Sequence, residues 1–127
     1  MRKIVLDMQS GLYAKAIQRI LAQELDDYQV MISDHPEKTS QICKTVKPYA
    51  LLMEATSYTP WMLEERLSIR NEVKSCSDDC KIVILVDDVA DKSLAAKVKA
   101  AKKDGLIDAF LFGSTTESYL TAMMDSL

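Results

Sequence analysis

Two runs of the sequence, YALLMEA at residues 49–55 and KIVILV at residues 81–86, are apolar at nearly every position. A strand with one face in water alternates apolar and polar side chains, whereas a strand covered on both faces shows a continuous apolar run. Both runs are far shorter than the roughly 20 apolar residues that a membrane-spanning helix needs. They therefore predict two strands in a sheet that is covered on both faces.

Three further runs have the residue content of strands: RKIVLDM at residues 2–8, DYQVMIS at residues 27–33 and IDAFLFG at residues 107–113. The segments between the five runs have the apolar spacing of helices. Strands that alternate with helices pair in parallel, because a parallel pair needs a crossover connection, and right-handed crossovers cover both faces of the sheet. We expect a three-layer α/β/α domain.

Apolar spacing and helix-capping residues indicate where the first two helices lie. The first should bury one face, made of Leu12, Ala16, Ile17, Ile20, Leu21 and Leu25. Pro36, with Asp34 three residues before Glu37, predicts the start of the second helix.

Similar signals mark the other three helices. Thr59 followed by Pro60 predicts the cap and first turn of a long helix that ends at residues 73–75. Asp91 should cap the next helix, and Gly105 should end it in a left-handed turn. A capping box from Ser114 to Glu117 predicts the start of the last helix, which is lined by Leu120, Met123, Met124 and Leu127.

Length and charge exclude several classes of protein. With 127 residues, 48% of them hydrophobic, the chain is expected to form a single domain over residues 1–127. The formal net charge of −3 argues against direct nucleic-acid binding, which needs clustered positive potential. Neither a signal peptide nor a membrane span is recognisable, and three cysteines fit reduced thiols. We expect a cytoplasmic protein without membrane contact.

Functional groups in open parallel sheets gather at the carboxyl ends of the strands. In this chain those ends fall at Asp7, at Ser33 and Asp34, at Glu54, at residues 86–88 and at residues 112–114. These positions are the candidates for a functional site.

Two stretches, KPYALLMEA at residues 47–55 and AKKDGLIDAFLFGS at residues 101–114, resemble the receiver domain of two-component response regulators. The order of elements and the length agree over essentially the whole chain. The resemblance implies a flavodoxin-like fold, a parallel sheet in the order 2-1-3-4-5 with five helices, and a role in phosphorelay signal transduction. Such domains commonly precede a DNA-binding or other output domain, so the chain is also compatible with the N-terminal part of a longer regulator.

In a working receiver an Asp at the end of the third strand accepts a phosphoryl group, and an acid pair after the first strand holds Mg²⁺. A Thr or Ser ends the fourth strand, and a Lys ends the fifth. In this sequence the corresponding positions carry Glu54, Asp7 with Met8, Val86 followed by Asp87, and Gly113. The resemblance therefore implies a degenerate phospho-acceptor pocket without a catalytic residue.

Each departure from the receiver pattern weakens phosphoryl chemistry. Glu54 places its carboxylate one methylene farther out, and attack geometry is sensitive at about the 1 Å scale. The thioether of Met8 is a poor ligand for a hard cation, and the Lys that would stabilise the phosphoryl charge is missing. The aromatic switch position falls on Phe110. Val86 occupies the partner position and has no hydroxyl that could form a hydrogen bond coupled to Phe110. We therefore expect a pseudo-receiver with one fixed conformation.

Charged residues on the last two helices suggest an interface. Lysines gather on the fourth predicted helix, and two acids lie on the fifth: Lys92, Lys97, Lys99, Lys102 and Lys103, with Glu117 and Asp125. Such a run is usually a solvated face. In receivers, however, this surface is where dimers and partners dock. We expect protein partners, either other signalling proteins or an output domain, and a homodimer through this face.

Other interpretations stay open. Asp7 and Glu54 are weak candidates for a Mg²⁺ site, although we expect no resident cofactor. An atypical but working phospho-acceptor that uses Mg²⁺ is one alternative function. A small-molecule-binding or catalytic flavodoxin-like domain is another, although no glycine-rich phosphate loop occurs. The leading hypothesis is a protein that is not an enzyme.

Overall fold

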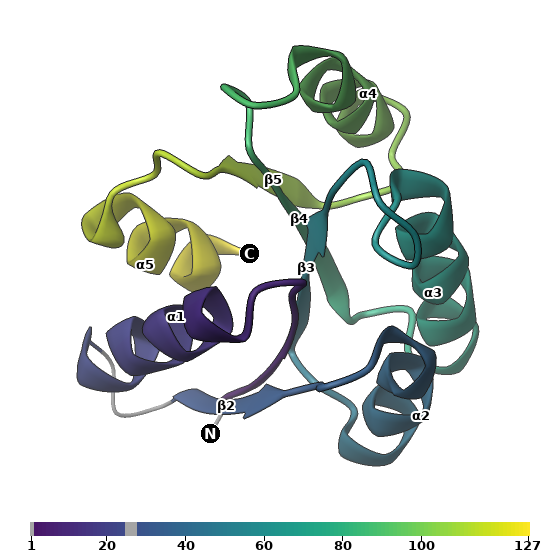
Figure 1. Ribbon diagram of the computed structural model, residues 1–127. Helices are drawn as coiled ribbons and strands as arrows, with labels where there is room; N and C mark the ends of the chain where they lie inside the picture. The colour runs from purple at the N-terminus through teal and green to yellow at the C-terminus, as the bar shows by residue number, and fades with distance from the viewer. Residues whose placement is uncertain (1, 25–27) are drawn as a thin grey trace.

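The computed structural model describes residues 2–24 and 28–127, which contain five strands and five helices in alternation (Figure 1). In chain order they are β1 (Arg2–Asp7), α1 (Gly11–Glu24), β2 (Tyr28–Ile32), α2 (Pro36–Val46), β3 (Ala50–Ala55), α3 (Leu63–Cys76), β4 (Lys81–Val86), α4 (Lys92–Lys103), β5 (Ala109–Phe112) and α5 (Glu117–Ser126). All neighbouring strands pair in parallel, in the order β2-β1-β3-β4-β5. This confirms the predicted flavodoxin-like fold.

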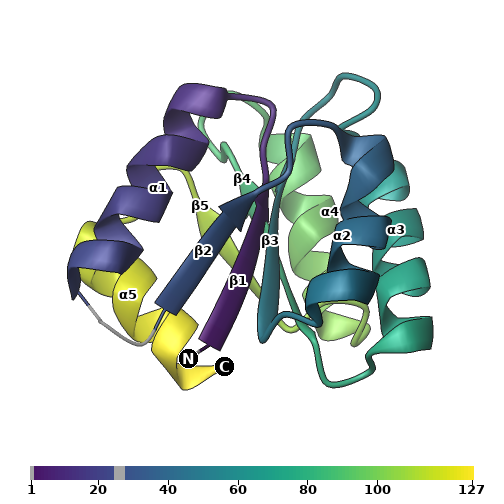
Figure 2. The ribbon, with the colours of Figure 1, turned by 90° about the horizontal axis from the view of Figure 1, so that it is seen from below.

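Helices cover both faces of the sheet. Figure 2 shows α1 and α5 on one face and α2, α3 and α4 on the other. The two apolar runs of the sequence are β3 and β4, which both have a strand on each side. Leu51, Leu52 and Ile84 have no exposed surface at all. The prediction of strands covered on both faces is therefore confirmed.

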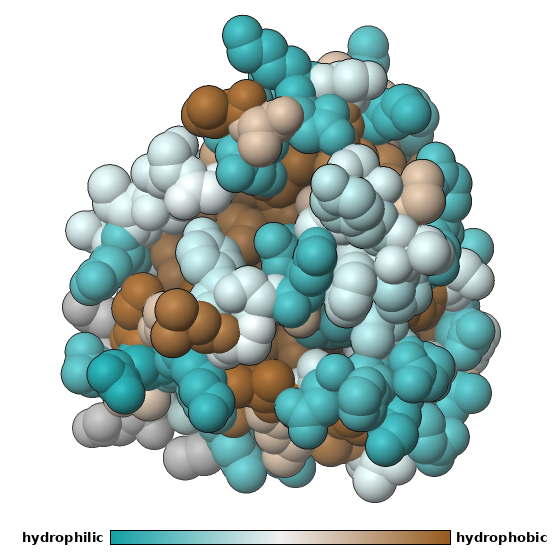
Figure 3. Space-filling view, in the orientation of Figure 1, coloured by the Kyte–Doolittle hydropathy of each residue, from teal (hydrophilic) through white to brown (hydrophobic). Residues whose placement is uncertain are grey.

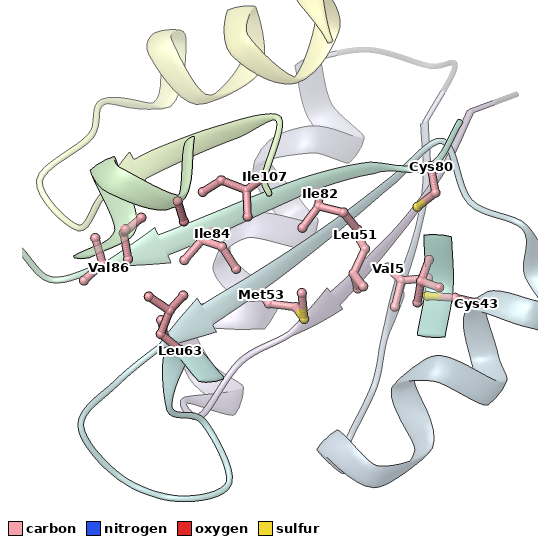
Figure 4. Close-up of a cluster of buried hydrophobic side chains, with 14 of the residues drawn as sticks. Val5, Cys43, Leu51, Met53, Leu63, Cys80, Ile82, Ile84, Val86 and Ile107 are labelled. Atoms are coloured by element: carbon pink, nitrogen blue, oxygen red, sulfur yellow. The ribbon is translucent and has the colours of Figure 1, made fainter. Parts of the chain in front are cut away.

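The core lies in two layers, one on each face of the sheet. Toward α2, α3 and α4, one cluster of buried side chains includes Val5, Met53 and Ile84 from the strands with Cys43 and Leu63 from the helices (Figure 4). Toward α1 and α5, alternate strand residues pack against helix residues: Ile4, Leu6, Leu52, Val83, Leu85 and Leu111 with Ala14, Ile17, Leu21, Leu120 and Met124. The sheet is thus held from both sides.

The predicted buried face of α1 is wrong in part. Ile17 and Leu21 are buried as expected, but Leu12 is 83% exposed and Ala16 is exposed too. The buried stripe runs through Ala14, Ile17 and Leu21. Successive residues of a helix are about 100° apart, so Leu12 and Ala16, two positions before and after Ala14, point away from that stripe. Leu25, which was expected on the same face, lies outside the described residues, as does Asp27 at the start of the predicted second strand.

The predicted start of α3 at Thr59 and Pro60 is also wrong, because the helix begins at Leu63. Thr59 and Pro60 belong to a loop that ends at Trp61, and the bond between them is cis. Trp61 donates its backbone N–H to the carbonyl of Tyr58, and its own carbonyl accepts from the N–H of Thr56. These backbone groups close the loop, so the helix can start only after it.

The other capping predictions have mixed outcomes. Asp91 caps α4 by accepting from the N–H of Leu94 at 3.0 Å, and Gly105 has the positive φ of +78° that a left-handed turn needs, both as predicted. Pro36 is the first residue of α2. The N-cap of α2 is His35, whose side chain makes no capping hydrogen bond. Ser114 does not cap α5.

The N-cap of α5 is Thr116, whose hydroxyl accepts from the N–H of Tyr119 at 3.2 Å. The reason is a turn in which the N–H of Thr115 bonds the carbonyl of Phe112, so the helix begins two residues later than the capping box predicts. None of the helices in residues 2–24 and 28–127 has the length and apolar character needed to cross a membrane.

Candidate functional site

Glu54 lies near the carboxyl end of β3, half-buried, and its carboxylate contacts the connection between β1 and α1. Glu54 Oε1 accepts from the backbone N–H of Gln9 at 2.9 Å and from that of Ser10 at 3.4 Å. Ser10 directly precedes α1, and its hydroxyl accepts from the N–H of Tyr13 at 3.2 Å. The carboxylate therefore sits at the positive end of the α1 dipole, where a negative charge is stabilised. Glu54 is a fixed anion that orders this connection.

Asp7 ends β1 and forms a buried ion pair with Arg66 of α3. Arg66 Nη1 lies 2.7 Å from Asp7 Oδ2, and the two side chains are 0% and 1% exposed. Arg66 also donates from Nη2 to the carbonyl of Asp7 at 3.1 Å and from Nε to the carbonyl of Glu54 at 2.7 Å. One guanidinium thus binds the ends of β1 and β3 together.

Two hydroxyl groups extend this network across the α2 side of the sheet. Thr39 of α2 donates from Oγ1 to Asp7 Oδ2 at 2.6 Å, and its oxygen lies 2.8 Å from Ser33 Oγ. Ser33 Oγ is also 3.1 Å from the carbonyl of His35. Asp7 Oδ1, in contrast, has no hydrogen-bond partner among the described residues. The network therefore connects the ends of β1, β2 and β3 with α2 and α3.

Side-chain oxygens at this edge of the sheet already have protein partners. Asp7 Oδ2 is paired with Arg66 and Thr39, although Asp7 Oδ1 has no partner among the described residues. Met8 is 7% exposed and offers only a thioether, and Glu54 Oε1 accepts from two backbone N–H groups. In the described part of the chain, no group of three or more His, Cys, Asp and Glu side chains is arranged to hold a metal ion. At the weak candidate site of Asp7 and Glu54, the cation in contact with Asp7 is the guanidinium of Arg66.

The other predicted pocket residues, Val86, Asp87 and Gly113, either lie in the core or make hydrogen bonds with the backbone. Val86 is buried in the layer that faces α2, α3 and α4. Asp87 uses Oδ1 to accept from the N–H groups of Val89 at 3.1 Å and Ala90 at 3.0 Å, which closes the turn before α4. Gly113 donates its N–H to the carbonyl of Val86 at 3.0 Å. Val86 and Gly113 therefore place no hydroxyl and no ammonium group at these positions.

Two cavities open on either side of Glu54, and Asp87 lines both. One, of about 410 Å³, is lined by Ser10, Tyr13, Glu54, Leu85, Val86, Asp87, Val89, Gly113 and Ser114. The other, of about 320 Å³, is lined by Gln9, Glu54, Ala55, Thr56, Ser57, Tyr58, Asp87, Ala90, Asp91 and Leu94. Burial, then Glu54 and Asp87, raise the pKa of the Tyr13 hydroxyl above its ordinary value, so Tyr13 stays neutral there.

Exposed apolar side chains lie around this edge of the sheet. Leu12 is 83%, Val89 77% and Tyr58 67% exposed. Val89 and Tyr58 each line one of the two cavities. The space-filling view shows hydrophobic side chains standing out over α1 and over the β4–α4 connection, among hydrophilic ones (Figure 3).

A second surface, which we call the α4–β5–α5 face, surrounds the predicted switch aromatic. Phe110 is partly buried, and its ring centroid lies 5.5 Å from that of Phe112. Lys99 Nζ lies 5.3 Å from the centre of the Phe112 ring. A groove of about 380 Å³ runs along Phe110, Phe112 and Tyr119. This face joins aromatic surface to positive charge.

The predicted interface residues do not all lie on this face. All five lysines are exposed, and Lys92, Lys99 and Lys103 repeat at steps of seven and four, so they share one side of α4. Lys97 instead lines a small cleft next to the start of α3. Asp125 forms an ion pair with Arg2 of β1, away from the lysines.

Sequence reasoning missed Arg66, Thr39 and Tyr13. The signal for Arg66 was a charged residue at an apolar position of α3: Leu63, Arg66 and Val73 are its three buried residues. An arginine on the buried face of a helix must meet a partner, because a lone buried charge is too costly. Its partner, Asp7, lies 59 residues earlier and is brought near only by the fold.

Comparison with known proteins gives matches in structure alone. No protein-family model matches the chain, and no curated protein matches it in sequence. A DNA-binding response regulator of the LuxR family from Staphylococcus aureus matches with a TM-score of 0.77 at 13% identity, over 99% of this chain and 98% of its own. A CheY-like protein, tadZ, from Pseudomonas aeruginosa matches with a TM-score of 0.74 at 17% identity, over 99% of this chain and 98% of its own.

A third similar structure is the BeF3-activated N-terminal receiver domain of RstA from Klebsiella pneumoniae. It matches with a TM-score of 0.75 at 14% identity, over 98% of this chain and 97% of its own. The chain therefore has the fold of response regulator receiver domains.

Proposed function

We propose that the chain is a receiver-like signalling domain that needs no phosphorylation and acts through contacts with other proteins. Its fold is that of proteins described as response regulators and receiver domains. A domain of this kind is not an enzyme, because its task is to present surfaces to a partner. The proposal depends on the state of the position at which receivers accept a phosphoryl group.

The observation that carries the proposal is the arrangement of Glu54 and Asp7. Glu54 Oε1 is bound by two backbone N–H groups, and Asp7 is bound by Arg66 and Thr39. A nucleophile needs a free oxygen in attack geometry and a cation that neutralises the incoming phosphoryl group. Here the cation is Arg66, which is already paired with Asp7. Val86 and Gly113 supply neither the hydroxyl nor the ammonium group that would hold the phosphorylated product.

Beryllium fluoride, a phosphoryl mimic, tests whether the pocket responds. Amide spectra of the ¹⁵N-labelled protein should stay unchanged when Mg²⁺ and beryllium fluoride are added, in particular at Gln9, Asp87 and Gly113. Shifts that saturate at these amides would contradict phosphorylation independence. The Glu54→Gln variant serves as the control, because any shift that it shares with wild type does not come from binding at the Glu54 carboxylate.

For the contact surface we propose the α4–β5–α5 face, with a second copy of the chain as partner. The aromatic groove of Phe110, Phe112 and Tyr119 supplies apolar area. Lys92, Lys99 and Lys103 of one copy would meet Glu117 at the start of α5 of the other. Asp125 is not part of this arrangement, because Arg2 already pairs with it.

Light scattering over a range of protein and salt concentrations tests this dimer. We expect a monomer–dimer equilibrium that weakens as salt rises. Tyr119→Asp should leave a monomer, whereas Leu12→Asp, a change of another exposed apolar residue, on α1, should not. A wild type that stays monomeric at all concentrations would overturn the dimer, though not the signalling role. An output domain on the same chain or another signalling protein would then be the partner.

A cytoplasmic location is part of this proposal. Cys43, Cys76 and Cys80 are free thiols, with Cys76 exposed, and exposed free thiols persist in a reducing compartment.

A further inference from the structure

Three oxygen atoms converge on the guanidinium of Arg66. They are Asp7 Oδ2 at 2.7 Å, the Glu54 carbonyl at 2.7 Å and the Asp7 carbonyl at 3.1 Å. The Thr39 hydroxyl lies on the same carboxylate oxygen, 2.6 Å away. The oxygens come from the ends of two neighbouring strands, and Arg66 and Asp7 themselves have 0% exposed surface.

One carboxylate oxygen and two main-chain carbonyls are a donor set for a hard cation, because Mg²⁺ and Ca²⁺ take oxygen ligands of these kinds. From this geometry we infer that Arg66 takes the place of a divalent cation: the chain carries its own positive charge among oxygens that would otherwise suit a metal ion. The inference rests on the ion pair alone and does not require the signalling role.

A built-in guanidinium differs from a bound metal in one physical respect: it is attached to α3, so it does not exchange with solvent. A metal ion would leave the ends of β1 and β3 dependent on its concentration. Arg66 makes their arrangement permanent and also fixes the first turn of α3 against both strands.

The substitution Arg66→Ala tests the inference, because it removes the guanidinium and leaves the oxygen donors with space between them. The measurement is the thermal midpoint Tm of the full chain in chelator and in millimolar Mg²⁺ or Ca²⁺. Arg70→Ala is the matched control: Arg70 lies one turn later on α3 and donates to the carbonyl of Leu106 at 2.8 Å.

We expect Mg²⁺ and Ca²⁺ to leave the Tm of wild type and of Arg70→Ala unchanged and to raise the Tm of Arg66→Ala by several degrees. An Asp7→Asn/Arg66→Ala variant, which lacks the carboxylate, should lose that response. A wild type that either metal stabilises would overturn the inference, and so would an Arg66→Ala variant that responds to neither.

Arg66→Ala could fail to fold in chelator, and the experiment still decides in that case. Folding upon addition of Mg²⁺ or Ca²⁺, followed by circular dichroism, supports the inference as strongly as a rise in Tm. If neither metal folds Arg66→Ala while Asp7→Asn/Arg66→Ala folds in chelator, the guanidinium neutralises Asp7 in a way that no metal can reproduce, and the exchange of metal for arginine is refuted.

Discussion

The buried pair of Asp7 and Arg66 gives a stability prediction whose size follows from its surroundings. Arg66→Met replaces the guanidinium with an apolar chain of similar length. It leaves the Asp7 carboxylate buried with only the Thr39 hydroxyl as a partner, because Asp7 Oδ1 has none among the described residues. Removing one member of a buried ion pair typically costs about 3–5 kcal/mol, since the other charge stays uncompensated.

That cost is large compared with the stability of a domain of this size. Small domains are stable by about 5–15 kcal/mol in total. The entropy of unfolding of about 2.1 cal/mol/K per residue converts 3–5 kcal/mol in 127 residues into a fall in Tm of roughly 10–20 °C. Arg70→Met loses two exposed hydrogen bonds, to the carbonyl of Leu106 and to Asn71 Oδ1, and should cost about 1–2 kcal/mol.

Urea unfolding followed by circular dichroism measures these free energies. If the cost arises from the unpaired charge, Asp7→Asn/Arg66→Met should recover most of it, because no charge is left buried. The reasoning is refuted if Arg66→Met costs no more than Arg70→Met. It is equally refuted if the double variant is as unstable as the sum of its single changes, since the two residues would then act independently.

Four smaller predictions concern other residues. Burial raises the pKa of Cys43 from its ordinary 9.0 to about 12 and that of Cys80 to about 11, so at pH 8 iodoacetamide should modify Cys76 alone, as peptide mapping would show. The same raised values mean that the free energy of unfolding is unaffected by these thiols below pH 9 and falls as pH rises toward about 12, which urea unfolding in alkaline buffers checks. Asp91→Ala should cost about 1 kcal/mol as a lost helix cap, and Asp91→Asn much less. Gly113→Lys should change stability by less than about 0.5 kcal/mol, because a Cβ there meets only the Cα of Asp87 at 3.8 Å; thermal unfolding checks both.

The sequence predicted the sheet well because apolar content is a local property. A continuous run such as KIVILV can be satisfied only between two layers of helices, and β4 lies there. Helix ends were less predictable, because several residues near each end can act as a cap. Thr116 rather than Ser114 caps α5, and the choice depends on a turn that the residue types do not specify.

The candidate site was predicted in its location but not in its contacts. Strand ends bring Asp7 and Glu54 to the same edge of the sheet, as the order of elements implied. However, Glu54 bonds toward α1 while Asp7 bonds toward α3. Successive side chains of a strand point to opposite faces of the sheet. Which helix then supplies a partner depends on how the helices pack on each face. Arg66 could therefore be recognised as Asp7's counter-ion only from the structure.

Intact-mass spectrometry after incubation with acetyl phosphate and Mg²⁺ tests the proposed function most directly. Wild type and Glu54→Asp should both keep their unmodified mass. The reason is that Arg66 forms an ion pair with Asp7, and the pocket lacks the hydroxyl and ammonium groups that would hold a phosphoryl group. A gain of one phosphoryl group by wild type would contradict the proposal and identify the domain as a working phosphorylation switch. A gain by Glu54→Asp alone would show that the rest of the pocket can still support phosphorylation, and this result would also contradict the proposal.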